Sequence, residues 1–138
     1  MSEANKDVVR RLEEAWGNND TATVDELLSD CVSHTEHLGG GQGLEAAKQA
    51  NGGTAMAFPD KKATIEDIFA EGDKVVARMR FTGTNEGGLP WFGIPANGNK
   101  VDFQWISIYR VADGKIAEHW AQMQVDKLMQ QLGAMPSM

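Results

Sequence analysis

The sequence predicts an α+β fold: a cone-shaped barrel in which a strongly curved antiparallel sheet wraps around three N-terminal helices, closed by a short C-terminal helix. Two observations predict this class. Apolar residues recur at helical spacing through most of the first 58 residues, whereas residues 63–124 alternate apolar and polar side chains as strands do. Such a sheet leaves a pocket between itself and the helices, and small-molecule sites usually lie in concave pockets.

Three helices are predicted in the N-terminal part. Residues 5–16 form one apolar face, made of Val8, Val9, Leu12, Ala15 and Trp16. Residues 21–29 predict a shorter helix with Asp20 or Thr21 as its cap. Residues 43–58 predict a third helix, but Gly52 and Gly53 lie in its middle, and each glycine costs about 1 kcal/mol relative to alanine. Either this helix breaks at the glycines, or a neighbouring segment packs close to them.

Four long strands and a short C-terminal helix follow. The strands are predicted at residues 63–70, 75–84, 100–110 and 115–124, with a short extended segment at 31–38 before them and a helix at 125–132 after them. Residues 71–74 and 112–114 have the glycine-containing composition of hairpin turns. Residues 85–99 form a long Gly- and Pro-rich loop that carries several large apolar side chains.

Length and charge exclude several classes of function. A chain of 138 residues predicts one domain, residues 1–138. The 13 Lys and Arg against 20 Asp and Glu give a net charge of -7, which repels phosphate backbones and anionic membranes, so we expect neither a nucleic-acid nor a membrane partner. No apolar run approaches the ~20 residues that span a bilayer. The N-terminus lacks the apolar segment of a signal peptide, and the lone Cys31 fits a reducing, cytoplasmic location.

The last third of the chain carries a family resemblance. Three segments resemble those of the SnoaL-like polyketide (ester) cyclases. They are Phe92 to Gly98 before a strand, Tyr109 through Asp113-Gly114 to His119-Trp120, and the closing segment from Leu128 to Gly133. These proteins belong to the wider group with the nuclear-transport-factor-2-like fold, and the likeness extends over nearly the whole chain in element order. Because this fold hosts enzymes of many kinds and non-catalytic binders, the resemblance predicts the fold more strongly than the activity.

The resemblance implies ring closure by intramolecular aldol chemistry on a polyketide ester, without a cofactor. It also implies a carboxylate two positions beyond the histidine of the last strand and a cavity histidine on the preceding strand. In this chain those positions are Ala121 and Ser107. Neither side chain transfers protons near neutral pH, so the family mechanism does not carry over unchanged.

Three titratable residues are candidates for catalysis. Strand alternation places His119 on one face with Ala117, Ala121 and Met123, the face that the resemblance assigns to the cavity. An imidazole suits acid–base work, although His119 could instead hydrogen-bond a neighbour to hold the sheet. His34 and Glu36 share one face of the extended segment at 31–38. They could act together with His119, or they could be solvated loop residues.

Neither a metal nor a cofactor is expected. His34, His37 and His119, with Glu36 or Glu118, include residue types that bind transition metals. However, His-x-x-His on a strand is not a spacing known for one metal site, and the resemblance implies a family that generally works without metal.

The expected wall of the pocket is aromatic and apolar. Trp105 and Ser107 face the cavity from the strand at 100–110, which suits a flat, oxygenated ligand such as a small apolar carbonyl compound. The full set of expected lining residues is Trp16, Met79, Phe81, Trp91, Trp105, Ser107 and Met123. The alternative for such an aromatic stripe is an ordinary core. On the opposite face, Ile106 and Ile108 predict a covered surface, which we interpret as a homodimer interface.

The leading functional hypothesis is a cofactor-independent cyclase or isomerase-type enzyme that acts on a small apolar, polyketide-like carbonyl compound by acid–base chemistry. His119, His34 and Glu36 would be its catalytic residues. The alternative from another class is a non-catalytic small-molecule binder with the same pocket, which Ala121 and Ser107 favour. A third and weaker possibility is a structural dimerisation module with a pocket filled by side chains.

Overall fold

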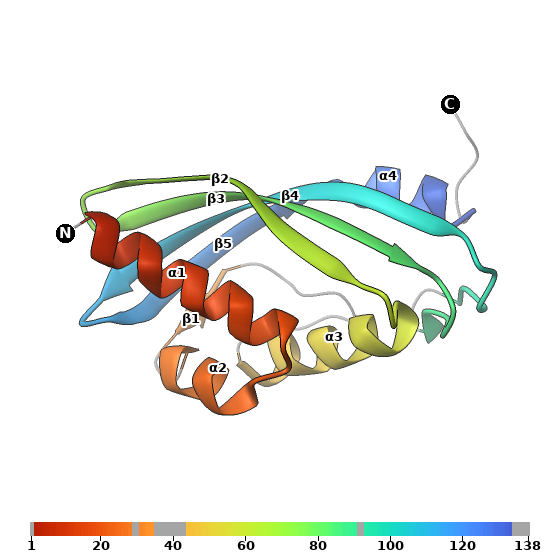
Figure 1. Ribbon diagram of the computed structural model, residues 1–138, viewed down its shortest axis with the longest axis horizontal. Helices are drawn as coiled ribbons and strands as arrows, with labels where there is room; N and C mark the ends of the chain where they lie inside the picture. The colour runs from red at the N-terminus through yellow and green to blue at the C-terminus, as the bar shows by residue number, and fades with distance from the viewer. Residues whose placement is uncertain (1, 29–30, 35–43, 91–92, 134–138) are drawn as a thin grey trace.

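A curved sheet covered by helices along one side forms the body of the molecule (Figure 1). The computed structural model describes residues 2–28, 31–34, 44–90 and 93–133. The helices are α1 (Ser2–Gly17), α2 (Thr21–Leu28), α3 (Leu44–Ala57) and α4 (Val125–Gln131). The strands are β1 (Val32–Ser33), β2 (Lys62–Glu71), β3 (Lys74–Thr84), β4 (Lys100–Ala112) and β5 (Lys115–Met123). The predicted α+β class, with three N-terminal helices and a short closing helix, is confirmed.

The sheet has the order β1-β5-β4-β3-β2. Strands β2 to β5 form an antiparallel meander, while the short β1 pairs parallel with β5. The hairpin between β4 and β5 turns at Asp113 and Gly114, which both have positive φ, as a two-residue turn of this kind requires. The remainder of the predicted segment at 31–38, from residue 35 onward, lies outside the described residues.

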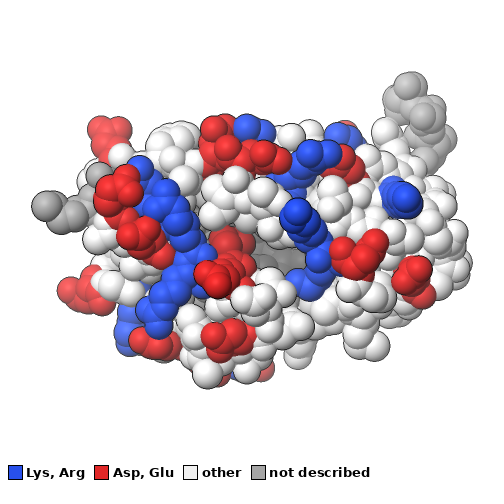
Figure 2. All heavy atoms as spheres, viewed as in Figure 1, with Lys and Arg blue, Asp and Glu red and all other residues white. Residues whose placement is uncertain are grey.

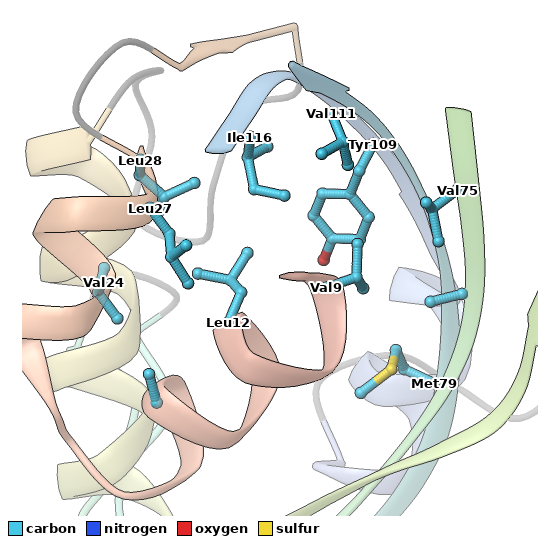
Figure 3. Packing of buried hydrophobic residues seen from close by; sticks show 12 residues of the cluster. Val9, Leu12, Val24, Leu27, Leu28, Val75, Met79, Tyr109, Val111 and Ile116 are labelled. Carbon is cyan, nitrogen blue, oxygen red and sulfur yellow. The ribbon is translucent and has the colours of Figure 1, made fainter. Parts of the chain in front are cut away.

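The inner face of the sheet is apolar because the strands alternate. On β3, Val75, Ala77, Met79 and Phe81 are all buried, in agreement with the predicted face. The first three of these side chains meet the apolar stripe of α1, whose Val9 and Leu12 are almost fully buried. Figure 3 shows this packing, with the Tyr109 ring pointing from the sheet toward α1.

Two apolar clusters fill the space under the sheet. The first joins α1 and α2 to β3, β4 and β5, and includes Leu12, Leu27, Met79 and Ile116. The second joins the end of α3 to β3, β4 and α4, and its members include Phe58, Phe81, Phe103, Leu128 and Leu132. Trp105 packs against both clusters, so it marks the boundary between the two halves of the core.

One buried amide organises the long loop before β4. Asn85 has no exposed surface, donates hydrogen bonds to the Pro95 carbonyl and to Asn97 Oδ1, and accepts one from the Gly88 backbone N–H. Asn97 in turn donates to the Leu132 carbonyl at 3.0 Å. The loop is therefore fixed to the C-terminal helix and not only to its neighbouring strands.

The two glycines in the third predicted helix do not interrupt it. Helix α3 runs continuously from Leu44 to Ala57, and Phe58 and Pro59 follow its end. A Cβ atom added at Gly52 would meet no atom within 4 Å. Close packing is therefore not the reason for a glycine at this position. Within the described residues, no helix is both long and apolar enough to cross a membrane.

Replacing Gly52 with alanine is expected to stabilise the protein by about 0.5–1 kcal/mol, because alanine gains helix propensity and the added methyl group meets nothing. Urea denaturation measures this change as a higher midpoint. The comparison variant is Gly87→Ala, whose Cβ would lie 1.9 Å from the Met56 carbonyl oxygen and should destabilise the fold. A Gly52→Ala variant that is less stable than the wild type would contradict the open surroundings of this helix position.

Candidate active site

Polar side chains gather on the inner face where β4 and β5 pair. The register sets Trp105 opposite Met123, Ser107 opposite Ala121 and Tyr109 opposite His119. Ser107 is only 1% exposed, although a serine hydroxyl is costly to bury without a partner. Its hydroxyl oxygen lies 3.3 Å from His119 Nε2.

Tyr109 and Ser107 both contact the imidazole of His119. Its ring stacks on Tyr109 with the centroids 4.9 Å apart, and Nε2 contacts Ser107. The residue remains partly accessible, whereas Tyr109 and Ser107 are buried. His119 is therefore the group in this cluster that combines a titratable nitrogen with access to a ligand.

A carboxylate that sequence reasoning did not single out completes this cluster. The Tyr109 hydroxyl donates a hydrogen bond of 2.5 Å to Glu13 Oε1, which α1 brings over the sheet. Burial raises the pKa of Glu13 above its ordinary value, and the hydrogen bond from Tyr109 and the charge of Lys61 only partly offset this effect. A signal was present in the sequence, because Glu13 is spaced four residues from Val9 and three from Trp16, beside the apolar stripe of α1.

Burial also shifts the pKa values of neighbouring groups. Desolvation and the adjacent Glu13 raise the pKa of the Tyr109 hydroxyl, while a hydrogen bond with Ser107 acts in the opposite direction. Burial lowers the pKa of the Lys61 ammonium group, and raises the pKa of the Cys31 thiol to about 11. Cys31 is thus a protonated thiol at neutral pH and a poor nucleophile.

The structure places His34 away from this cluster. Its Nε2 lies 2.8 Å from Glu118 Oε2, and its ring stacks on Trp120 with the centroids 4.9 Å apart. Glu118 also accepts a hydrogen bond of 2.6 Å from Arg110 Nε. These residues alternate with His119 and Tyr109 along β5 and β4, so they lie on the outer face of the sheet. The His34 N–H donates a hydrogen bond of 2.9 Å to the His119 carbonyl, so the two residues are neighbours, but their side chains lie on opposite faces of the sheet, and their joint catalytic role stays a prediction.

The predicted lining residues occupy several environments. Met79 and Phe81 are buried in the two apolar clusters. Trp16, Trp105 and Met123 are partly buried at the edges of these clusters. Their role as lining residues stays a prediction. Glu36, His37 and Trp91 lie outside the described residues.

A hollow opens on the face shown in Figure 2, where α1, α3 and β2 come together in the view of Figure 1. Acidic side chains flank it on one side and basic side chains on the other. Among the residues that the structure describes, no group of three His, Cys, Asp or Glu residues comes close enough together to hold a metal ion. The polar cluster of Glu13, Tyr109, Ser107 and His119 is suited to hydrogen bonding and proton transfer with an organic ligand.

The fold and this cluster define a protein of the cone-shaped α+β class with a candidate small-molecule site. Residues 6–132 match the family of SnoaL-like polyketide cyclases, and the chain belongs to this family. It is 32% identical over 123 residues to the aklanonic acid methyl ester cyclase DnrD of Streptomyces peucetius, covering 82% of this chain and 79% of that protein. The resemblance found in the sequence is thereby confirmed.

Two solved structures from Streptomyces extend the comparison. AclR from Streptomyces galilaeus, a proposed hydroxylase, superposes with a TM-score of 0.86 at 26% identity, covering 99% of this chain and 89% of that one. IdmH from Streptomyces antibioticus, a proposed polyketide cyclase, has a TM-score of 0.81 at 30% identity, with coverage of 94% and 98%. Both comparisons agree with the observed fold.

The register adds a physical detail to the family relationship. Ser107 and Ala121 are direct cross-strand partners on β4 and β5. They are the two positions for which the resemblance implies a histidine and a carboxylate. This chain therefore has neither titratable group at one adjacent pair of sites, while Glu13 provides a carboxyl group from the opposite wall.

The hydrogen bonds that join Glu118 to Arg110 and His34 on the outer face predict a pH-dependent loss of stability in Glu118→Gln. Hydrogen bonds to Arg110 and His34 lower the pKa of Glu118 below its ordinary 4.5, so the carboxylate stabilises the fold above that pH. The variant should therefore unfold at a lower urea concentration at pH 7. The difference should shrink as the pH falls below about 4.5, through the lowered pKa of the folded state. The exposed Glu71→Gln is the matched control, and equal losses in both variants would contradict the assignment.

Proposed function

We propose that this protein is a cofactor-independent cyclase or isomerase-type enzyme that acts on a small, polyketide-like carbonyl compound. The observation that carries the proposal is the polar cluster around His119, which lies on the inner face of the sheet in a chain of the polyketide cyclase family. The cyclase relative named above acts on aklanonic acid methyl ester. A polyketide ester with neighbouring carbonyl groups is accordingly the substrate class that we propose.

The proposed reaction is an intramolecular aldol-type ring closure. A proton leaves the carbon next to one carbonyl group, the enolate carbon forms a bond with a second carbonyl carbon, and the oxygen of that carbonyl receives a proton. The product is an isomer of the substrate, so no oxidant, reductant or second substrate is consumed. Hydrogen-bond donors that face the developing oxyanion in a desolvated site favour such a step.

His119 is the residue that we propose to contact the reacting oxygen. Stacking on Tyr109 and the contact with Ser107 fix the orientation of its ring. A preorganised donor costs little reorganisation when negative charge develops on the substrate oxygen. Trp105 and Met123, cross-strand partners at the junction of the apolar clusters, offer surfaces for a flat apolar ligand.

The second candidate is a non-catalytic small-molecule binder. The observation that favours it is the cross-strand pair Ser107 and Ala121, which leaves no proton-transfer group at that level of the sheet. A binder and an enzyme differ in whether the ligand leaves unchanged, and this difference can be measured directly.

Partner binding is proposed for the outer face of the sheet. Phe69, Val76, Ile108 and Trp120 are successive cross-strand partners and form a row across β2, β3, β4 and β5, which we call the outer apolar row. Phe69 is 59% exposed and Ile108 36%, and the adjacent Ile106 is 47% exposed. An antiparallel sheet that faces water normally carries polar residues there, so we propose that a second copy of the chain covers this row.

Replacing His119 with alanine is expected to lower kcat at least about 100-fold, because acid–base and hydrogen-bonding groups contribute factors of this size. The assay is conversion of aklanonic acid methyl ester and related polyketide esters, followed by mass spectrometry and chromatography. The matched control is Gln122→Ala, an exposed residue on the same strand, which should retain turnover.

Three outcomes of this experiment separate the hypotheses. Wild-type protein that binds these compounds and returns them unchanged would make the chain a binder. Turnover that survives in His119→Ala would remove this residue from the mechanism. Turnover that is lost in His34→Ala instead would support the sequence-based assignment of His34 over the structural one.

The proposed dimer predicts that charge placed in the outer apolar row and at the adjacent Ile106 separates the subunits. The double variant Ile106→Lys with Ile108→Lys should sediment as a monomer where the wild type sediments as a dimer, because two lysines cannot be buried cheaply in an apolar interface. Met56→Lys is the control, since Met56 is 77% exposed on α3, away from the sheet face. A wild type that is monomeric at micromolar concentrations would rule out the interface.

A further inference from the structure

We propose that Glu13 is the catalytic carboxylate of this site: it removes the proton from the substrate carbon and returns it to the newly formed alkoxide. This inference rests on the proposed cyclase function and specifies which side chain performs the proton transfer. It assigns the role to helix α1, on the opposite wall from Ala121, where the family resemblance implied a carboxylate.

The geometry joins Glu13 to the rest of the site through hydrogen bonds. Tyr109 donates to Glu13 Oε1 at 2.5 Å, and the Ser107 hydroxyl is hydrogen-bonded with Tyr109. Ser107 Oγ also lies 3.3 Å from His119 Nε2. With the His119 proton on Nε2, the four groups form one chain in which each donates to the next, from His119 to the carboxylate of Glu13.

This chain of hydrogen bonds holds the carboxylate of α1 against the inner face of the sheet, the face that carries His119. Tyr109 and Ser107 are 3% and 1% exposed, so they serve as fixed positioning residues. Glu13 and His119 are both partly accessible at the two ends of the chain. A substrate that contacts both ends places its acidic carbon and its reacting oxygen beside separate polar groups, as the aldol step requires.

The surroundings of Glu13 increase the basicity of its carboxylate. Burial raises the pKa of its carboxyl group, which makes the carboxylate a stronger base than one in water. Among the described residues, Tyr109 on β4 and Lys61, the residue just before β2, face the Glu13 carboxyl group. Both favour the ionised form, so they keep the pKa of Glu13 from rising further. In the part of the chain that the structure describes, Cys31 and His119 are further titratable neighbours of Tyr109.

The proton that Glu13 removes from the substrate is returned to it within the same reaction, so no net proton is gained or lost. The Glu13 carboxylate takes the carbon-bound proton, and the enolate forms its new bond with the second carbonyl carbon. The resulting alkoxide accepts the proton back from the carboxylic acid, which regenerates the carboxylate. During these changes the substrate oxygen accepts the hydrogen bond from the His119 Nε2–H in place of Ser107 Oγ, and the imidazole is itself unchanged at the end.

A purely structural role for Glu13 makes different predictions. In that case the bond from Tyr109 would only tie α1 to the sheet, and an amide at position 13 could accept the same hydrogen bond. Glu13→Gln retains the acceptor oxygen and removes the basic group. Catalysis and folding are thereby separated in one substitution.

The test compares Glu13→Gln with Glu14→Gln, an exposed carboxylate at the next position of the same helix. With aklanonic acid methyl ester or whichever polyketide ester the wild type converts, Glu13→Gln should lose at least about 100-fold in kcat. Its KM and thermal midpoint should stay close to those of the wild type. Glu14→Gln should keep kcat within about twofold.

Tyr109→Phe provides a second, independent readout. The hydrogen bond from Tyr109 lowers the pKa of Glu13, so its removal should raise that pKa. If Glu13 is the base, the ascending limb of kcat/KM against pH moves to higher pH in Tyr109→Phe. This readout also decides the question if Glu13→Gln fails to fold.

The outcomes distinguish this inference from the proposed function. A wild type that converts none of the esters overturns the cyclase proposal, and the role of Glu13 with it. A wild type that converts them, with kcat unchanged in Glu13→Gln or a stationary pH limb in Tyr109→Phe, overturns the role of Glu13 alone. Loss of kcat in Glu13→Gln together with the shifted limb supports it.

Discussion

The pairing of β4 on both of its edges is the constraint on which the rest of the structure depends. Eleven of its residues are in register with β3, and its second half is in register with β5. A strand held on both sides cannot rotate, so each of its side chains is committed to one face. Ser107 and Tyr109 are thereby turned toward the helices, while Ile106 and Ile108 are turned outward. If the register of β4 shifted by one residue, Ser107 and Tyr109 would face outward, and Ile106 and Ile108 would face the helices.

This division creates two electrostatic environments for the same chemical group. Glu118 on the outer face accepts bonds from Arg110 and His34, and its pKa falls. Glu13 on the inner side has one short bond from a neutral hydroxyl and loses its water, so its pKa rises. The first environment stabilises a charge, and the second raises the basicity of a carboxylate. The contrast is the physical reason to look for chemistry inside the barrel and for structural ion pairs outside it.

Much of the fold was predictable because the strands alternate with a strict period of two. Strand β3 shows the clearest case, since every residue predicted to face inward is buried. The register of His119 opposite Tyr109 was harder to obtain, because it depends on the positions of the turn and of a bulge between Arg110 and Val111. The contact between Glu13 and Tyr109 joins residues 96 positions apart, and local patterns carry no information about which strand a helix will cover. His34 is the converse case: its residue type predicted chemistry, but the parallel pairing of β1 with β5 brings it beside Glu118 and Trp120.

Helix α4 also acts as a cover for one end of the core and as a partner for the edge of β4. Leu128 and Leu132 fill the second apolar cluster, and the Gln131 side chain bonds both the N–H and the carbonyl of Asp102, as a neighbouring strand would. Asn97 and Asn99 bond carbonyl groups at the end of the same helix. Without α4 in place, Phe81 and Phe103 would be uncovered and the edge of β4 would be unpaired at Asp102. Exposed apolar surface and open strand edges favour aggregation. The docking of α4 is thus the folding step that hides this aggregation-prone surface.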